Sequence, residues 1–302
     1  MAKIAVAGAT GLIGKKLIDA LLKRGDTVVI IGRDTKKIQE VFPNVKLYSD
    51  YSLNYLKVLE NTDVFINLAG ANVAGNRWSE EYKKQIINSR VSSTKAIINI
   101  INYLKYKPHS YLTASAIGYY GISETKTFTE EDFAGNDFLA KVCNTWETEA
   151  NEITKLGIRK VAVRIGIVLD KQGGALQKML IPFYLFLGGP LGDGTQWFSW
   201  IHSEDLINIF LFAIDNKQVT GAINATAPNP VRLKHCTTAL GRVINRPSIF
   251  IVPEFVLKII MGEAHYIVTK GNRVIPKKLI EMGFNFKYNE IEIALKNLLN
   301  KK

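Results

Sequence analysis

The chain contains little cysteine and histidine, and it has no long apolar run. Its two cysteines, Cys143 and Cys236, cannot form a disulfide framework or a four-ligand zinc site, and its four histidines show no metal-ligand spacing. The longest apolar runs, 161–169 and 180–187, fall short of the roughly 18 residues that a membrane span needs. A strand pattern from Lys3 leaves no room for a secretory signal. We therefore expect a cytoplasmic protein with no metal site and no membrane partner.

Proline is also scarce, with 9 residues among 302, and the composition is otherwise that of a globular protein. Hydrophobic residues make up 47% of the chain, which is enough for a sizeable core. The net charge of +12 is uneven, because from Val231 onward there are 13 lysines and arginines against 5 acidic residues. These basic residues are scattered rather than clustered with stacking aromatics. We interpret them as a solvated surface and expect no nucleic-acid partner.

Short β-branched runs alternate with helical patterns along the first half of the chain. The strand patterns cover Lys3–Ala7, Thr27–Ile31, Val45–Tyr48, Asp63–Leu68, His109–Ala114 and Arg159–Ile165. The helical patterns cover Leu12–Lys23, Thr35–Val41, Leu53–Leu59, Glu80–Leu104 and Asn136–Leu156, and further along Ser203–Asp215, Lys234–Val243, Pro253–Met261 and Asn289–Leu299. Several strands are apolar on both sides, as expected for repeated βαβ units. The pattern predicts an α/β fold of the Rossmann type, with a doubly wound parallel sheet.

The same pattern predicts two domains. We expect a cofactor-binding domain over residues 1–166, to which some later segments return. A smaller, mixed C-terminal domain over residues 167–302 is expected to close the cleft, because the helical and strand patterns loosen after Gly166. The cleft between the two domains is the natural ligand site.

The loop after the first strand is rich in glycine and opens a helix. Gly8 permits the tight turn, Gly11 lets the backbone approach a pyrophosphate, and Gly14 allows the helix to pack closely on the sheet. The alternative is a simple tight turn, but the position inside a βαβ unit favours dinucleotide binding. The loop residues expected to touch the cofactor are Gly8, Thr10, Gly11, Leu12, Ile13 and Gly14.

The end of the second strand indicates which dinucleotide is bound. Arg33 precedes Asp34 after this strand, and its guanidinium can pair with the 2′-phosphate of NADP in a bidentate way. Asp34 is then expected to cap the helix that begins at Thr35. In the alternative interpretation Arg33 is solvated and Asp34 binds the ribose of NAD. We predict NADP as the cofactor.

Several further motifs lie at the expected ends of strands and in the second half. They are Asn67-Leu68-Ala69-Gly70, Ser115–Gly121 and Trp200-Ile201-His202-Ser203-Glu204-Asp205. With the glycine loop, these motifs resemble the extended short-chain dehydrogenase/reductases, the NAD(P)-dependent sugar epimerase and dehydratase superfamily. More specific segments are similar to the branch of epimerase family proteins that carries a C-terminal domain of unknown function. Those segments are Arg77-Trp78, Ser89-Arg90-Val91, Phe138-Leu139-Ala140, Trp146-Glu147, Gly189-Pro190-Leu191-Gly192, Gln196-Trp197 and Ala227-Pro228.

The resemblance implies additional cofactor contacts. Asp50 matches the acidic residue that reads the adenine amino group, or else it forms a turn. Arg90 is expected to pair with a cofactor phosphate, or alternatively with a surface acid. His202 is expected to fix the turn of its motif rather than to ligate anything. The cofactor contacts predicted beyond the glycine loop and Arg33 are Asp50, Leu68, Ala69, Gly70, Arg90 and Ile167.

The departures from the superfamily concern its catalytic residues. Active members use a Tyr and, four residues later on the same helix, a Lys that lowers the pKa of the phenol. The matching positions here hold Leu139 and Cys143, which lie on an apolar helix stripe. Lys141 is rotated about 200° away from Cys143 around the helix. Cys143 is interpreted as a small buried hydrophobe, with a catalytic thiol as the alternative.

Three hydroxyls remain as candidate proton donors: Ser115, Tyr119 and Tyr120. The serine position of the superfamily falls on Ala116, so Ser115 reaches the nicotinamide only if the strand carries a one-residue bulge. Otherwise its hydroxyl is satisfied by local backbone. Tyr119 and Tyr120 are alternatively the aromatic walls of a pocket.

These observations predict an NADP(H)-binding oxidoreductase or epimerase-like protein. It would transfer a hydride between the nicotinamide and a small-molecule substrate. Turnover with ordinary sugar nucleotides is expected to be slow, because the Tyr and Lys pair is missing. The alternative is a protein without turnover that senses NADP(H) and presents its C-terminal domain to a partner.

Overall fold

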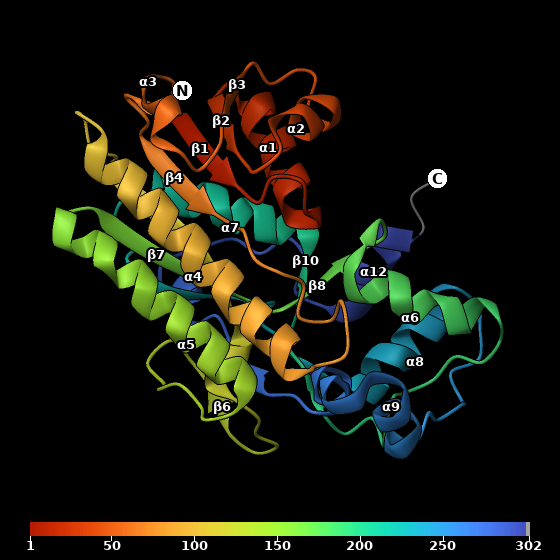
Figure 1. The fold of residues 1–302 in the computed structure, drawn as a ribbon. Helices are drawn as coiled ribbons and strands as arrows, with labels where there is room; N and C mark the ends of the chain where they lie inside the picture. Colours follow the sequence, from red (N-terminus) through yellow and green to blue (C-terminus); the bar gives the residue numbers. More distant parts are fainter. Residues whose placement is uncertain (300–302) are drawn as a thin grey trace.

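The computed structural model describes residues 1–299, and a seven-stranded parallel sheet with the order β11-β7-β5-β4-β1-β2-β3 lies at its centre (Figure 1). Its strands are β1 (Lys3–Ala7), β2 (Thr27–Ile31), β3 (Leu47–Ser49), β4 (Val64–Asn67), β5 (Ser110–Ala116), β7 (Arg159–Ile165) and β11 (Gly221–Ala225). All six neighbouring pairs are parallel. This order is that of a doubly wound sheet, so the Rossmann-type prediction is confirmed.

The remaining elements surround this sheet. Three two-stranded sheets pair β8 (Ile167–Asp170) with β10 (Trp200–His202), β9 (Trp197–Phe198) with β12 (Val231–Arg232), and β6 (Thr127–Phe128) with β13 (Arg273–Val274). The α-helices are α1 (Leu12–Arg24), α2 (Thr35–Val41), α3 (Leu56–Leu59), α4 (Glu80–Tyr103), α5 (Phe138–Asn151), α6 (Gly174–Tyr184), α7 (Ser203–Asp215), α8 (Leu233–Val243), α9 (Glu254–Met261), α10 (Tyr266–Thr269), α11 (Lys277–Glu281) and α12 (Ile291–Leu299). Short 3₁₀ turns are η1 (Leu53–Tyr55), η2 (Ile117–Tyr120), η3 (Glu152–Leu156) and η4 (Gly262–His265).

Side chains along β1 point alternately to the two faces of the sheet, and each face is covered by a layer of helices. Ile4 and Val6 belong to the core that Leu17 of α1 and Phe210 of α7 also enter. The intervening alanines of β1 face the opposite core, which α4 and α5 cover. Figure 1 shows α4 and α5 side by side across that face. Because both faces of the strand are buried, its residues read as a continuous apolar run.

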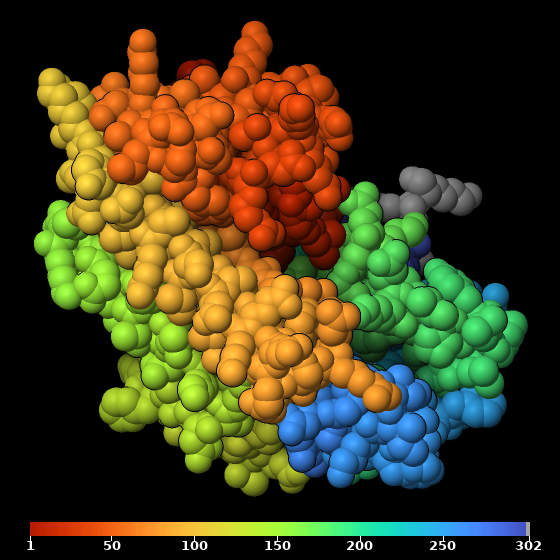
Figure 2. Space-filling view, in the orientation of Figure 1, coloured from red at the N-terminus to blue at the C-terminus, as the bar shows by residue number. Residues whose placement is uncertain are grey.

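Two segments beyond residue 166 belong to the large sheet. β11 is its edge strand and pairs with β7, and α7 packs against α1. A separate core lies among α6, α8 and α12, around the fully buried Trp200 of β10. Figure 2 shows a hollow between the red and orange surface of the first residues and the green surface around α6. The sheet domain and the C-terminal core therefore flank a recess.

The structure differs from the predicted elements mainly between residues 45 and 59. β3 is shorter than its predicted strand, and the predicted helix 53–59 divides into η1 and α3. Asp50 and Ser52 accept hydrogen bonds from backbone amides two residues further on. Such local bonds favour turns over a continuous helix. Among the helices between residues 1 and 299, none has the length and apolar character to cross a membrane.

Candidate functional site

The glycine loop joins β1 to α1 at the carboxyl edge of the sheet. Gly8 has a φ of 80°, and a Cβ on it would lie 2.6 Å from the carbonyl carbon of Leu68. A Cβ on Gly14 would lie 2.4 Å from the carbonyl oxygen of Gly8. Gly11 is different, because the nearest atom to its added Cβ is 3.5 Å away. Gly8 and Gly14 are thus required by close packing, whereas a side chain on the exposed Gly11 would make one ordinary contact.

The first turn of α1 is suited to an anion. Gly11 is its N-cap and supplies no side-chain acceptor, and the first turn holds no acidic residue. Its free amides and helix dipole therefore favour a phosphate. Thr10 and Gly11 are exposed, while Leu12 and Ile13 are half-buried. Leu12 also contacts the turn that precedes α6, where a Cβ on Gly173 would lie 3.3 Å from its Cδ1 atom.

Arg33 and Asp50 follow the neighbouring ends of β2 and β3. Arg33 is exposed, and its positive charge opposes the rise that burial causes in the pKa of Tyr51. The carboxylate of Asp34 accepts a hydrogen bond from the amide of Lys37 at 3.0 Å and caps α2, as predicted. The carboxylate of Asp50 accepts from the amide of Ser52 at 2.7 Å. The turn-forming alternative for Asp50 thus describes its observed contact, and the side chain of Arg33 is exposed to solvent.

The loop after β4 is held by the buried side chain of Asn67. Its carbonyl oxygen accepts from the amide of Ala69 at 3.0 Å, and its amide group donates to the hydroxyl of Tyr111. Leu68 and Ala69 are half-buried, and Gly70 is exposed next to Arg90. The sequence analysis did not include Asn67 among the site residues. The sequence feature that could have identified Asn67 is a polar residue at the end of an otherwise apolar strand.

Arg90 lies beside this loop without an acidic partner among residues 1–299. Its guanidinium donates to the carbonyl oxygens of Ala71 and Ile86, at 3.1 and 2.8 Å, and lies 5.0 Å from the ring centre of Trp146. Burial lowers its pKa. Because this cation borders Gly70 and pairs with no acid in the described chain, the surface-acid alternative is wrong.

Ser115 does not have the geometry of a free catalytic hydroxyl. β5 pairs regularly with β7 through Ala116, with Ser115 opposite Arg164, so the bulge that the prediction needed is not formed. Ser115 is buried, and its hydroxyl donates to the carboxylate of Glu147 at 2.6 Å. The alternative of a local backbone partner is also wrong. An acid from α5, 32 residues away in sequence, takes the hydroxyl instead.

Glu147 and Arg164 form the centre of a buried network. The guanidinium binds the carboxylate through two hydrogen bonds of 2.9 Å, and this pairing raises the pKa of Arg164. Arg164 also donates to the hydroxyl of Tyr120 at 2.9 Å, and Tyr120 donates to the side chain of Asn224 at 2.6 Å. Burial raises the pKa of Tyr120. Sequence reasoning missed this network, although a charged residue inside the apolar strand β7 was its signal.

Tyr119 is the one predicted donor whose hydroxyl makes no hydrogen bond within residues 1–299. The residue is partly exposed, and the guanidinium of Arg164 lies 3.4 Å from its ring centre. The ring also meets Tyr120 edge to face. Ser115 and Tyr120 are therefore members of the buried network, whereas the hydroxyl of Tyr119 is not, and the role of each as a proton donor stays a prediction.

The expected positions of the catalytic Tyr and Lys are occupied by residues that pack next to η2. Leu139 and Cys143 on α5 face η2, where a Cβ on Gly118 would lie 3.1 Å from the Cβ of Leu139. Cys143 is buried, and burial raises the pKa of its thiol to about 11. It is a small buried hydrophobe, as interpreted from the sequence, and Lys141 is exposed on the other side of the helix.

Ile167 and His202 belong to the small sheet of β8 and β10. Ile167 is half-buried and pairs with Trp200, at the border of the C-terminal core. The Nδ1 atom of His202 accepts from the amide of Glu204 at 3.0 Å and so caps α7. This agrees with the expected role in the turn. No group of three or more His, Cys, Asp and Glu side chains in residues 1–299 could hold a metal.

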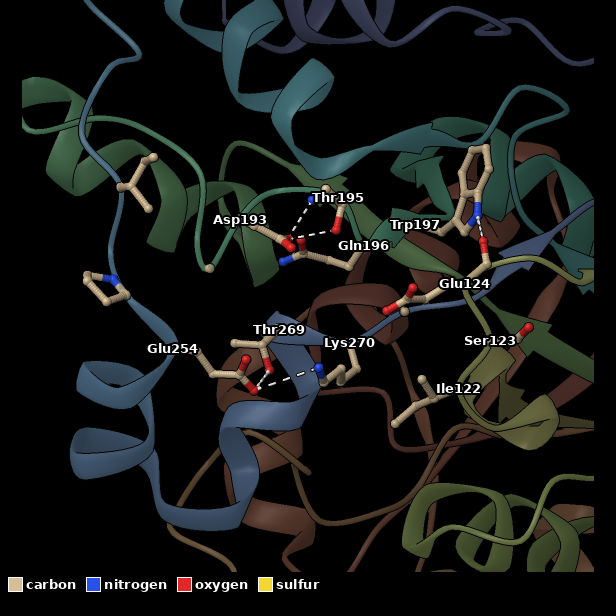
Figure 3. A pocket seen from close by; sticks show the side chains of 14 residues that line it. Ile122, Ser123, Glu124, Asp193, Thr195, Gln196, Trp197, Glu254, Thr269 and Lys270 are labelled. Carbon is tan, nitrogen blue, oxygen red and sulfur yellow. Dashed lines mark hydrogen bonds and ion pairs between the residues drawn. The ribbon is translucent and has the colours of Figure 1, made fainter.

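A pocket of about 380 Å³ lies past the end of η2, where residues 122–124 face the C-terminal region (Figure 3). The segment 192–197, the start of α9 and the end of α10 supply the other walls. The amide of Ser123 donates to the carbonyl of Gly271, and Asn272 donates to the carbonyls of Ile117 and Gly121. These bonds link the pocket to η2, which follows the carboxyl end of β5.

The sheet order and the glycine loop define a nucleotide-binding protein of the Rossmann type. A model of the NAD dependent epimerase/dehydratase family matches residues 4–225, and a model of a domain of unknown function (DUF1731) matches residues 252–298. The chain belongs to the NAD dependent epimerase/dehydratase family, and the resemblance seen in the sequence is confirmed.

Named relatives extend over the whole chain. It is similar to the Epimerase family protein SDR39U1 homolog, chloroplastic, of Arabidopsis thaliana, with 40% identity over 98% of this chain and 86% of the relative. Epimerase family protein YfhF of Bacillus subtilis is 38% identical, with 98% and 97% covered. Among solved structures, human epimerase family protein SDR39U1 (isoform2) with NADPH has a TM-score of 0.89 and 28% identity, covering 99% of this chain and 100% of that one.

Proposed function

We propose that this protein binds NADP(H) along the carboxyl edge of its sheet and acts as an oxidoreductase or epimerase-like enzyme. The observation that carries the proposal is the first turn of α1, which has no side-chain cap and begins at the exposed Gly11. Arg90, which has no acidic partner in the described chain, adds a cation next to Gly70. The NADPH named with the human relative supports the same cofactor.

Arg33 is the residue that would select NADP(H) over NAD(H). It is exposed directly after β2, and Asp34, the residue that would otherwise bind the ribose of NAD, is engaged as the cap of α2. A charge-assisted phosphate contact contributes roughly 1.5–3 kcal/mol, which corresponds to a preference of about tenfold or more.

Fluorescence titration of both reduced cofactors tests this selection. We expect Arg33→Ala to weaken NADPH binding by about tenfold or more and to leave NADH binding nearly unchanged. Lys36→Ala, at an exposed position of α2, is the matched control and should change neither affinity. Equal affinities of the two cofactors for the unmodified protein would contradict the proposal.

Hydride transfer is the chemistry that a bound nicotinamide supplies. The pocket lined by residues 122–124 would hold the substrate beside the nicotinamide. Tyr119 would exchange a proton with the substrate oxygen. Tyr119 is proposed because the hydroxyls of Ser115 and Tyr120 are already held by Glu147 and Asn224. With Leu139 in place of the usual Tyr, turnover of sugar nucleotides would be slow.

A panel of alcohols and carbonyl compounds, followed by NADPH absorbance, tests the chemistry. For any substrate that turns over, we expect Tyr119→Phe to lower kcat by about 100-fold, the lower range for general acid-base catalysis. Tyr103→Phe changes a tyrosine that is 61% exposed on α4 and should leave kcat unchanged. An unchanged kcat in Tyr119→Phe would rule out its role.

A non-catalytic NADP(H) sensor is the second candidate. The observation that favours it is that Leu139 and Cys143, which pack next to Gly118, stand where active superfamily members have Tyr and Lys. Tight NADPH binding without turnover of any compound in the panel would support the sensor and overturn the enzyme.

A further inference from the structure

We propose that an exposed apolar surface on the C-terminal part of the protein binds membranes that carry anionic lipid headgroups. The apolar surface is formed by residues 181–187, at the end of α6, and by residues 249–260, which include α9. These two segments hold eleven of the twenty-one large apolar side chains that are exposed within residues 1–299, so the exposed apolar area is concentrated there. The inference goes beyond the proposed function, because none of the proposed cofactor contacts lies in either segment.

The two segments lie side by side in the fold. The amide of Phe250 donates to the carbonyl oxygen of Gly188 at 3.1 Å. The guanidinium of Arg246 lies 4.4 Å from the ring centre of Phe186. α9 follows at Glu254, and Figure 1 shows α6, α8 and α9 at the same end of the molecule. The exposed side chains of the two segments therefore belong to one region of the protein surface.

Both helices contribute outward-facing apolar side chains. In α6, Phe183 is buried in the C-terminal core, whereas Leu185, just after the helix, is 64% exposed. In α9, Leu257 is the buried residue. Phe255 and Ile259 lie one helical turn apart and are 66% and 68% exposed. Monomeric proteins rarely expose apolar patches larger than about 300–600 Å², so a concentration of this kind indicates a binding surface.

The charges on the same segments are mostly positive. Lys178 of α6 and Lys258 of α9 are exposed, and Arg246 is half-buried beside the end of α6. Glu254 is the single acid in residues 178–187 and 246–260. Its carboxylate lies 3.9 Å from the ammonium of Lys270, which partly neutralises it. The surface thus combines apolar side chains with net positive charge, as in proteins that lie in the headgroup region of anionic membranes.

A second copy of this chain is the other occupant that so large an apolar surface would suit, since a stable interface takes about 800 Å² on each partner. A two-fold pairing of the apolar surface would bring its cations towards the same cations of the second copy. Anionic headgroups would instead attract all of them, so the charges favour a membrane. The sequence predicted no membrane partner because no apolar run can span a bilayer. The apolar surface joins two segments and would enter only the headgroup region.

Co-sedimentation with lipid vesicles tests the inference. We expect the full chain to bind vesicles of phosphatidylcholine and phosphatidylglycerol at least about tenfold more tightly than vesicles of phosphatidylcholine alone. Raising the salt concentration should weaken this binding, because salt screens the attraction between the basic side chains and the headgroups. No binding to the mixed vesicles, or equal binding to both kinds, would overturn the inference.

Two variants on separate segments locate the binding. We expect Leu185→Ser and Phe255→Ser each to weaken binding to the mixed vesicles by about tenfold, because each removes a large apolar side chain that would leave water. Phe133→Ser is the matched control, since Phe133 is 91% exposed but lies outside both segments, and it should not change vesicle binding. Circular dichroism verifies that all three variants fold. Unchanged vesicle binding in both surface variants would show that the site is wrong.

Light scattering without lipid distinguishes a membrane from a second copy. A monomer that binds the mixed vesicles would support the inference. A dimer that Phe255→Ser dissociates, together with no vesicle binding by the unmodified protein, would assign the apolar surface to a second copy and contradict the inference.

Discussion

Arg164 and Glu147 explain why the hydroxyls near the site are not free. A lone cation inside β7 would be costly, and the carboxylate compensates it with two hydrogen bonds. The same carboxylate then takes the hydroxyl of Ser115, which is consequently fixed as a donor to the protein. Any ligand near Ser115 could only donate to it. The role of this serine is thus set by an acid one helical turn beyond Cys143.

The glycines of the loop differ in what a side chain would disturb. We expect Gly11→Val to fold normally and to weaken NADPH binding by about 10- to 100-fold, since its Cβ makes no clash within the protein and its side chain would stand where a phosphate would lie. Gly14→Val is expected to destabilise the fold itself by about 1–3 kcal/mol or more, because its Cβ would overlap the carbonyl of Gly8. Urea denaturation and NADPH fluorescence separate the two effects. Full binding in a folded Gly11→Val protein would show that the pyrophosphate lies elsewhere.

At the scale of elements, α7 connects the two parts of the chain. His202 caps its first turn and stacks on Tyr288, with ring centres 3.8 Å apart. The carboxylate of Asp205 accepts from the backbone amides of Lys287 and Tyr288, at 3.0 and 2.9 Å. The motif 200–205 therefore docks the C-terminal segment on a helix that belongs to the sheet domain.

The N-terminus of α7 holds an acid-sensitive group, the imidazole of His202. Burial lowers the pKa of His202 to about 4, below the usual 6.5 of the unfolded chain. The unfolded state therefore takes up a proton first, and the contribution of His202 to stability is complete above pH 6.5 and lost as the pH falls to 4. The loss amounts to roughly 3 kcal/mol.

His202→Asn tests this contribution, because asparagine can still cap the helix but does not titrate. We expect the difference in unfolding free energy between the original protein and the variant to shrink by roughly 3 kcal/mol from pH 7 to pH 4. Chemical denaturation at a series of pH values measures it. Parallel pH profiles for the two proteins would show that His202 is not the acid-sensitive group.

At the scale of the whole molecule, two cores meet at the site. The cofactor edge belongs to the large sheet, while most of the pocket wall comes from segments after residue 190. Leu12 contacts the turn before α6, and Asn272 holds the turn after β5. The site is therefore assembled from segments that are far apart in sequence, and its geometry depends on how the C-terminal part seats on the sheet.

Much of the fold could be predicted because its signals are local. Helices α2 and α7 have the predicted bounds, and α1 and α4 agree within a residue. Gly25 ends α1 in the left-handed conformation, with a φ of 86°, as its stop position indicates. Each signal arises within one or two helical turns of chain, so a single sequence contains it.

The direction of side chains at the site could not be predicted in the same way. Ser115 points at Glu147 because β5 stays in register with β7, and the orientation of the Gln196 amide is fixed because the carbonyls of Leu191 and Val268 accept from its nitrogen. These partners are set by contacts between distant segments.

The sequence by itself determined the parallel sheet, the glycine loop, the absence of the Tyr and Lys pair, and the cap at Asp34. Periodicity and turn chemistry act between neighbouring residues and survive without tertiary contacts. Only the tertiary structure decided that Ser115 and Tyr120 are engaged, that Arg90 lacks an acidic partner in the described chain, and that a pocket lies beside η2. Those outcomes depend on burial and on pairing across the fold, where an unsatisfied charge or hydroxyl takes whichever partner packing brings to it.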